Sequence, residues 1–155
     1  MIARLACATV LLLAPVTGAS AIAVFAGGGF VTAATNECSD AVIFAGLYLS
    51  AGYSPANLSG NGPNTDLTFG TLPQLAAPFA THVSVVGAPT PGFTKTKATT
   101  VSTTAKVYNA RVSINEKPAV TIDTQHLALV VKVKNLSGII GCDVTLELSL
   151  RRAPF

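Results

Sequence analysis

Two segments near the C-terminus alternate between apolar and polar residues with a period of two. Their apolar positions are Leu127, Leu129, Val131 and Val133 in residues 126–134, and Val144, Leu146, Leu148 and Leu150 in residues 143–151. This period is that of a β-strand with one buried face. With residues 137–140 as the connecting loop, the two segments form an antiparallel hairpin in which Val131 faces Leu146.

The charged residues of this hairpin support the same register. It places Lys134 opposite Asp143 and Lys132 diagonal to Glu147, on the face opposite the four apolar positions of each segment. Opposite charges across a strand pair stabilise it, and a slip of one residue would exchange the two faces. The sequence therefore predicts a half-buried antiparallel sheet with its charges facing water.

The rest of the chain follows the same period, with Gly, Pro and Asn clusters between the apolar runs. Further strands are expected at 24–32, 41–49, 66–69, 79–86, 99–114 and 120–122. Residues 41–49 are apolar on both faces and are typical of a central strand. The apolar phase shifts within 99–114, which predicts a β-bulge near Val107 and Tyr108. About eight strands at this spacing indicate an all-β fold, and we expect a single antiparallel β-sandwich domain over residues 22–155.

The N-terminus has the form of an export signal. Arg4 precedes the apolar run 5–16, and Ala19, Ser20 and Ala21 form a small-residue cleavage site. We expect a signal peptide over residues 1–21 and an extracytoplasmic protein, secreted or at the cell surface. The alternative is a retained membrane anchor, because residues 5–34 carry no charge. Contact with a membrane is expected only in that case.

Removal of residues 1–21 leaves two cysteines, Cys38 and Cys142. In an exported chain such a pair favours a disulfide over two buried free thiols. The bridge would close a loop across 104 residues of sequence separation, for which the chain-entropy relation gives about 4–5 kcal/mol of stabilisation. We expect this bridge to tie the start of the domain to its last strand.

Composition and motifs argue against catalysis and against nucleic acid as a partner. Only 11% of the residues are charged, and the net charge of +3 is not gathered into a basic run. The chain has two histidines, His82 and His126, and neither a Gly-x-Ser-x-Gly motif nor a metal-ligand spacing. We therefore expect no catalytic residues, no metal and no cofactor.

Two stretches are interpreted as loops, 52–64 and 87–98, where a ligand site would most often lie. Their candidate binding residues are Tyr53, Asn57, Asn61 and Asn64 in the first, and Phe93, Lys95 and Lys97 in the second. The alternative is that these residues belong to solvated turns. Asn57 and Asn135 would also be glycosylation sites in a host that glycosylates.

The charge is distributed unevenly along the chain. Residues 22–94 contain three acidic residues and no Lys or Arg, whereas residues 95–155 contain nine basic and four acidic residues. Opposed halves, low total charge and the separable segment 22–34 favour contact between copies or with another surface protein. We expect an exported, self-assembling structural protein such as a fibre, coat or appendage subunit. The alternatives are a monomeric secreted binding module and, third, a small secreted hydrolase.

Overall fold

The computed structural model describes residues 23–154, except residues 59, 61, 72–79 and 101–105. The expected signal peptide lies outside the described residues. Eight antiparallel strands are present, and each pairs with the next along the chain. They are β1 (Phe25–Ala34), β2 (Tyr48–Ser54), β3 (Asn64–Gly70), β4 (Ala80–Val86), β5 (Thr94–Thr100), β6 (Lys106–Lys117), β7 (His126–Lys134) and β8 (Val144–Arg152).

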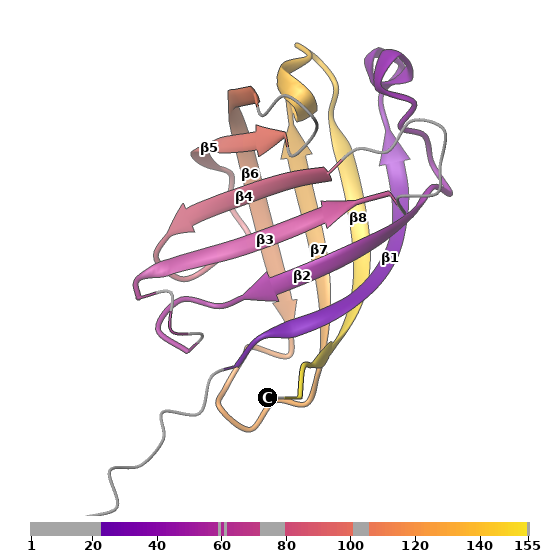
Figure 1. Cartoon of the computed structure of the whole chain (residues 1–155). Helices are drawn as coiled ribbons and strands as arrows, with labels where there is room; N and C mark the ends of the chain where they lie inside the picture. The colour runs from indigo at the N-terminus through magenta and orange to yellow at the C-terminus, as the bar shows by residue number, and fades with distance from the viewer. Residues whose placement is uncertain (1–22, 59, 61, 72–79, 101–105, 155) are drawn as a thin grey trace, which may run out of the picture.

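The all-β, antiparallel prediction is confirmed, but the expected sandwich is wrong: the strands close into a barrel because β1 also pairs with β8. In Figure 1, β2, β3 and β4 run across the front while β6, β7 and β8 rise behind them. The long β1 bends from the front group to the back group. Two crossed layers and a closed barrel produce the same alternation of buried and exposed residues, so the sequence pattern could not separate them.

The glycines of β1 make this closure possible. A Cβ atom on Gly29 would collide with the carbonyl oxygen of Glu147, and one on Gly27 with the carbonyl oxygen of Ser149, both in β8. Glycines in a strand commonly mark such a close approach or a bend in a barrel. The register between β1 and β8 also shifts between Val31 and Ala33. The apolar N-terminal segment is therefore a strand of its own domain, paired on both sides.

The interior is filled with side chains from all eight strands, as expected for a barrel of this size. The largest fully buried side chains are Tyr53, Phe25, Phe69, Leu49, Leu67, Leu127, Leu129, Leu136, Leu146, Leu150, Val31 and Val83. The predicted hairpin is confirmed residue by residue: Val131 pairs with Leu146, and Leu129 pairs with Leu148. Lys134 Nζ lies 3.6 Å from Asp143 Oδ2, on the outer face.

One end of the barrel is covered by two short 3₁₀ helices, η1 (Asn36–Ala41) and η2 (Leu136–Gly138). The predicted disulfide joins Cys38 in η1 to Cys142 just before β8. Thr35 reinforces this junction, because its hydroxyl donates to the carbonyl oxygen of Gly141 at 2.6 Å and accepts from the Asp143 amide at 3.0 Å. The bridge therefore fastens the turn after β1 to the turn before β8.

Three expected strands differ from the structure. Most of residues 41–49 form the end of η1 and a turn, in which Val42 and Gly46 have positive φ angles. The apolar residues on the second face of this segment are exposed rather than buried, which explains the misleading pattern. The expected strand 99–114 falls on two strands, β5 and β6, whose uninterrupted register contains no bulge at Val107 and Tyr108. Residues 120–122 form no strand.

Candidate functional site

The residues expected in the first loop do not converge on a site. Tyr53 belongs to β2 and is buried inside the barrel, with 1% of its surface exposed. Asn57 has a φ of 61°, so it serves a turn whose geometry Asn tolerates. Asn64 begins β3 and is half-buried, and Asn61 lies outside the described residues. The described residues of this expected loop therefore have separate structural roles and form no common site.

The residues expected in the second loop lie close together on the outside of the barrel. Lys95 and Lys97 belong to β5 rather than to a loop, and Phe93 immediately precedes that strand. The expected loop 87–98 extends too far, because the threonines and lysines of residues 94–98 lack the apolar alternation typical of a strand. These residues are polar because β5 presents its lysines to solvent, and not because they form a loop.

Three cations lie opposite one another across three neighbouring strands. Lys95 on β5 pairs with Arg111 on β6, and Arg111 pairs with Lys134 on β7. All three side chains point away from the barrel interior, and we call them the cationic row. Like charges directly opposite in a sheet destabilise it. Lys134 is balanced by Asp143, whereas Lys95 and Arg111 form no ion pair with any described residue.

The ring of Phe93 lies beside two cations of this row, Lys134 and Arg111. Its ring centre lies 4.9 Å from Lys134 Nζ and 5.7 Å from Arg111 Cζ, distances at which a cation is attracted to an aromatic face. The hydroxyl of Ser113 donates to the carbonyl oxygen of Pro91 at 2.7 Å, and the Ile114 amide donates to Thr90. These bonds fasten the segment before Phe93 to β6. Phe93 thus orients two of the cations.

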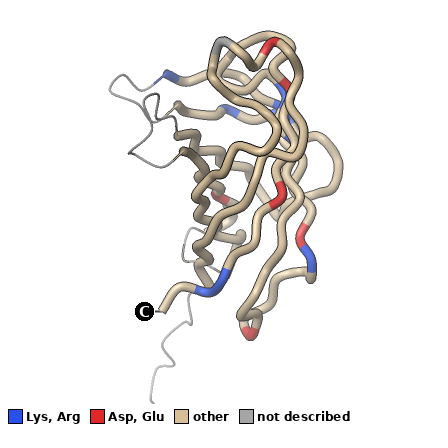
Figure 2. The backbone as a smooth tube through the Cα atoms, turned by 90° about the vertical axis from the view of Figure 1, so that its right-hand side faces the viewer, with Lys and Arg blue, Asp and Glu red and all other residues tan. Residues whose placement is uncertain are grey.

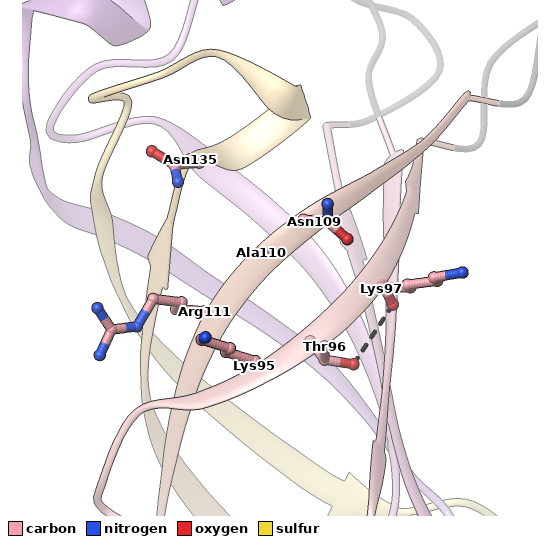
Figure 3. A pocket seen from close by; sticks show the side chains of 7 residues that line it. All are labelled: Lys95, Thr96, Lys97, Asn109, Ala110, Arg111 and Asn135. Atoms are coloured by element: carbon pink, nitrogen blue, oxygen red, sulfur yellow. Dashed lines mark hydrogen bonds between the residues drawn. The ribbon is translucent and has the colours of Figure 1, made fainter.

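The cationic row borders two shallow hollows. The first, about 660 Å³, is lined by the residues of Figure 3: Lys95, Thr96, Lys97, Asn109, Ala110, Arg111 and Asn135. Lys95 and Arg111 lie side by side in that view, while the ammonium group of Lys97 points away from Arg111. The second hollow, about 360 Å³, lies on the other side of Phe93 and includes Lys134 and Thr145. Both volumes fall within the range of small-ligand sites.

Sequence reasoning found Lys95, Lys97 and Phe93 but missed Arg111, Asn109 and Asn135. Ending one strand at Thr100 and beginning the next at Lys106 would have found Arg111, because the β5–β6 register sets it opposite Lys95. The uninterrupted strand expected at 99–114 concealed this pairing. The prediction that Lys134 lies opposite Asp143 is confirmed, but the sequence analysis did not identify Arg111 as the neighbour of Lys134 on β6.

A separate pair of ionisable groups links β2 and β6: the buried Tyr53 and the half-buried Glu116. The Tyr53 hydroxyl donates to Glu116 Oε1 at 2.5 Å, and Glu116 Oε2 accepts from the Val120 amide at 3.2 Å. Burial, and then the hydrogen bond to Glu116, raises the pKa of Tyr53 far above its usual value. The phenol therefore stays protonated and acts as a structural donor rather than as a base.

A possible hydrolytic grouping lies on the outer face of β3 and β4. His82 Nε2 is 3.4 Å from Asp66 Oδ1, and Ser84 pairs with Asp66 in the strand register. A nucleophilic serine needs a hydrogen bond to its histidine. Among the described contacts, the Ser84 hydroxyl makes none to His82. The described residues also contain no group of three or more His, Cys, Asp or Glu side chains placed to hold a metal.

Comparison with known proteins adds no relationship: no family model, curated protein or solved structure matches this chain. Within the described part of the chain, none of the helices has the length and apolar character needed to cross a bilayer.

Proposed function

We propose that this protein is an exported, non-catalytic binding module that holds an anionic ligand on the outer face of β5, β6 and β7. The observation that carries the proposal is the cationic row. Lys95 and Arg111 are set opposite each other although this pairing costs stability, and Phe93 orients the row. A ligand that supplies carboxylate, sulfate or phosphate oxygens would offset the repulsion and form charge-assisted hydrogen bonds.

The surroundings of the row support binding rather than catalysis. Asn109 and Asn135 place amide groups in the same hollow as the cations. Asn135 Oδ1 already accepts from the Gly141 amide at 3.1 Å, which fixes the orientation of this side chain. Lysine, arginine and amide donors are suited to holding an anion in place. The disulfide agrees with an oxidising compartment and thus with the proposed export.

The test is binding of fluorescent dextran sulfate, measured by anisotropy at low salt. The double variant Lys95→Gln with Arg111→Gln should bind at least about tenfold more weakly, a loss of about 1.4 kcal/mol. A matched control, Lys117→Gln with Arg151→Gln, removes the same charge from exposed positions outside both hollows. Equal losses of affinity in the two double variants would mean that binding depends only on net charge, and would contradict the proposal.

A second candidate function is self-association, as expected from the sequence. It is favoured by four exposed apolar side chains on β1, β2 and the turn between them: Phe30, Val42, Phe44 and Tyr48, with 44–54% of their surfaces exposed. The rings of Phe30 and Tyr48 pack edge to face with centres 5.3 Å apart. Exposed apolar clusters often mark protein contacts. Because β1 is paired on both sides, with β2 and β8, a second copy would dock through these side chains rather than by strand addition at β1.

Sedimentation velocity over a range of concentrations tests this second candidate. Self-association predicts concentration-dependent dimers that the double variant Phe44→Ser with Tyr48→Ser abolishes. Val86→Ser, which removes an apolar side chain that is 81% exposed on β4, should leave the dimers intact. A strict monomer at all concentrations would exclude this function and leave the binding module unaffected.

A further inference from the structure

The ligand class can be narrowed by the shape of the surface around the cationic row; this step rests on the function proposed above. The first hollow lies over β5 and β6, and the second lies over the ends of β7, β8 and β1. Phe93 links them, because it contacts Arg111 from the first and shares the second with Lys134. The two hollows thus form one shallow track across five consecutive strands of the barrel.

The length of this track exceeds what a single small anion would occupy. Neighbouring strands lie about 4.8 Å apart, so the path from β5 to β1 across β6, β7 and β8 is about 20 Å long, measured along the curved surface of the barrel. The cations are concentrated in the first half of the track. The second half offers Lys132, Lys134 and Thr145, small or apolar residues such as Ala33 and Ala34, and the carboxylate of Asp143, which Lys134 balances. The lining favours a narrow chain whose anionic groups lie over the first hollow and whose polar groups extend over the second.

The groups that line the first hollow indicate the chemistry of that chain. Lys95, Arg111 and the amides of Asn109 and Asn135 supply many hydrogen-bond donors and few acceptors. An acidic sugar unit has the complementary composition, with carboxylate or sulfate oxygens beside ring oxygens and hydroxyl groups. Amide side chains can both donate to and accept from such hydroxyl groups.

Other polyanions fit the surface less well. An extended acidic peptide commonly binds by adding a strand to a sheet edge, whereas the cationic row lies on the outer face of the sheet, where β6 and β7 are each paired on both sides. Single-stranded nucleic acid needs exposed aromatic faces for base stacking, whereas the ring of Phe93 already contacts two cations. A membrane is a flat surface, and the cations here line a hollow rather than a protruding patch. We infer that the track binds a linear acidic polysaccharide.

The test is isothermal titration calorimetry with oligogalacturonates of increasing length. Affinity should rise with length until the chain spans both hollows and then level off, and methyl esterification of the carboxylates should abolish binding. The variant Thr145→Glu places a negative charge in the second hollow. It should weaken long chains by about tenfold and leave the disaccharide unaffected. Ser149→Glu, on the same strand but outside the track, should weaken neither.

Three results would overturn the inference in distinguishable ways. Equal affinity for short and long chains would reject the extended track while leaving a single anion site. Tighter binding of oligothymidylate, polyglutamate or vesicles rich in phosphatidylserine, at matched charge, would reject the polysaccharide class. Absence of binding to every one of these probes and to dextran sulfate would reject the proposed function itself.

Discussion

At the scale of single residues, the hydrogen bond between the buried Tyr53 and the half-buried Glu116 shows how a polar contact joins two layers of the barrel. Tyr53 comes from β2 and Glu116 from β6, so their hydrogen bond crosses the interior between the two layers of Figure 1. The second carboxylate oxygen is satisfied by the Val120 amide. A buried polar group that loses its partner is costly. The pair therefore holds the layers at a defined distance.

Tyr53→Phe should destabilise the protein by about 1–3 kcal/mol, because Glu116 loses its donor. The variant should also change the response to alkali. Since the pKa of Tyr53 is raised in the folded protein, the wild type keeps the proton that the unfolded chain releases above about pH 10. Stability from this group is complete below that pH and falls as pH rises.

Urea unfolding at neutral pH and above pH 10 measures both effects. The variant should lose less stability than the wild type over this interval, because it lacks the Tyr53 hydroxyl. Some loss should persist, because Tyr108, whose pKa burial also raises, remains. Identical pH dependence in the two proteins would contradict the role assigned to Tyr53.

At the scale of elements, the glycines of β1 determine whether the barrel closes. Gly29→Ala should destabilise the fold by about 1–3 kcal/mol, because its Cβ atom would collide with the β8 backbone and force β1 away. Gly52→Ala is the matched control on β2. Its Cβ atom would meet no atom closer than the Phe25 carbonyl oxygen at 4.0 Å. Thermal unfolding of both variants tests this, and equal melting temperatures would contradict the explanation of closure.

The elements also show what the sequence could predict and what it could not. The hairpin of β7 and β8 was predictable because its apolar face and its Lys134–Asp143 pair require the same register. Residues 41–49 were misread because Phe44 and Val42 are apolar yet more than half exposed. The local alternation of apolar and polar residues indicates which face of a strand is expected to be buried. It does not indicate whether residues distant in sequence pack against that face, or whether the first and last strands pair.

Only part of the candidate site could be predicted from the sequence, for the same reason. Phe93 and Lys95 stood out as an aromatic residue and a cation in a polar stretch. Their partner Arg111 lies 16 residues beyond Lys95 in sequence and becomes adjacent only through the β5–β6 pairing. Predicting the site therefore required knowing where β5 ends and β6 begins, and the threonine-rich composition of this region conceals both boundaries.

At the scale of the whole molecule, one barrel is closed by strand pairing and fastened by one covalent bridge. Charged residues are few along the chain, 11% of the total, as the mostly tan tube of Figure 2 illustrates for the described residues. The disulfide between Cys38 and Cys142 joins segments 104 residues apart, so it constrains most of the unfolded chain. It also lies at the end where η1 and η2 cover the core.

The double variant Cys38→Ala with Cys142→Ala should lose about 4–5 kcal/mol of unfolding free energy, mainly through the gain in entropy of the unfolded chain. Chemical denaturation with and without a reductant measures this. Reductant should destabilise the wild type and leave the variant unchanged. Wild-type stability that is insensitive to complete reduction would contradict the contribution assigned to the bridge.

The central claim is that the cationic row exists for a ligand and not for the fold. The measurement that tests it most directly is the salt dependence of dextran sulfate binding, made together with the unfolding free energy of each protein. In the variant Lys95→Gln with Arg111→Gln, the slope of log affinity against log salt should be shallower, because fewer counterions are released. Its unfolding free energy should be equal to or higher than that of the wild type, by up to about 1 kcal/mol, because a like-charged pair is removed. An unchanged salt slope together with a loss of stability would contradict the claim, since the row would then serve the fold.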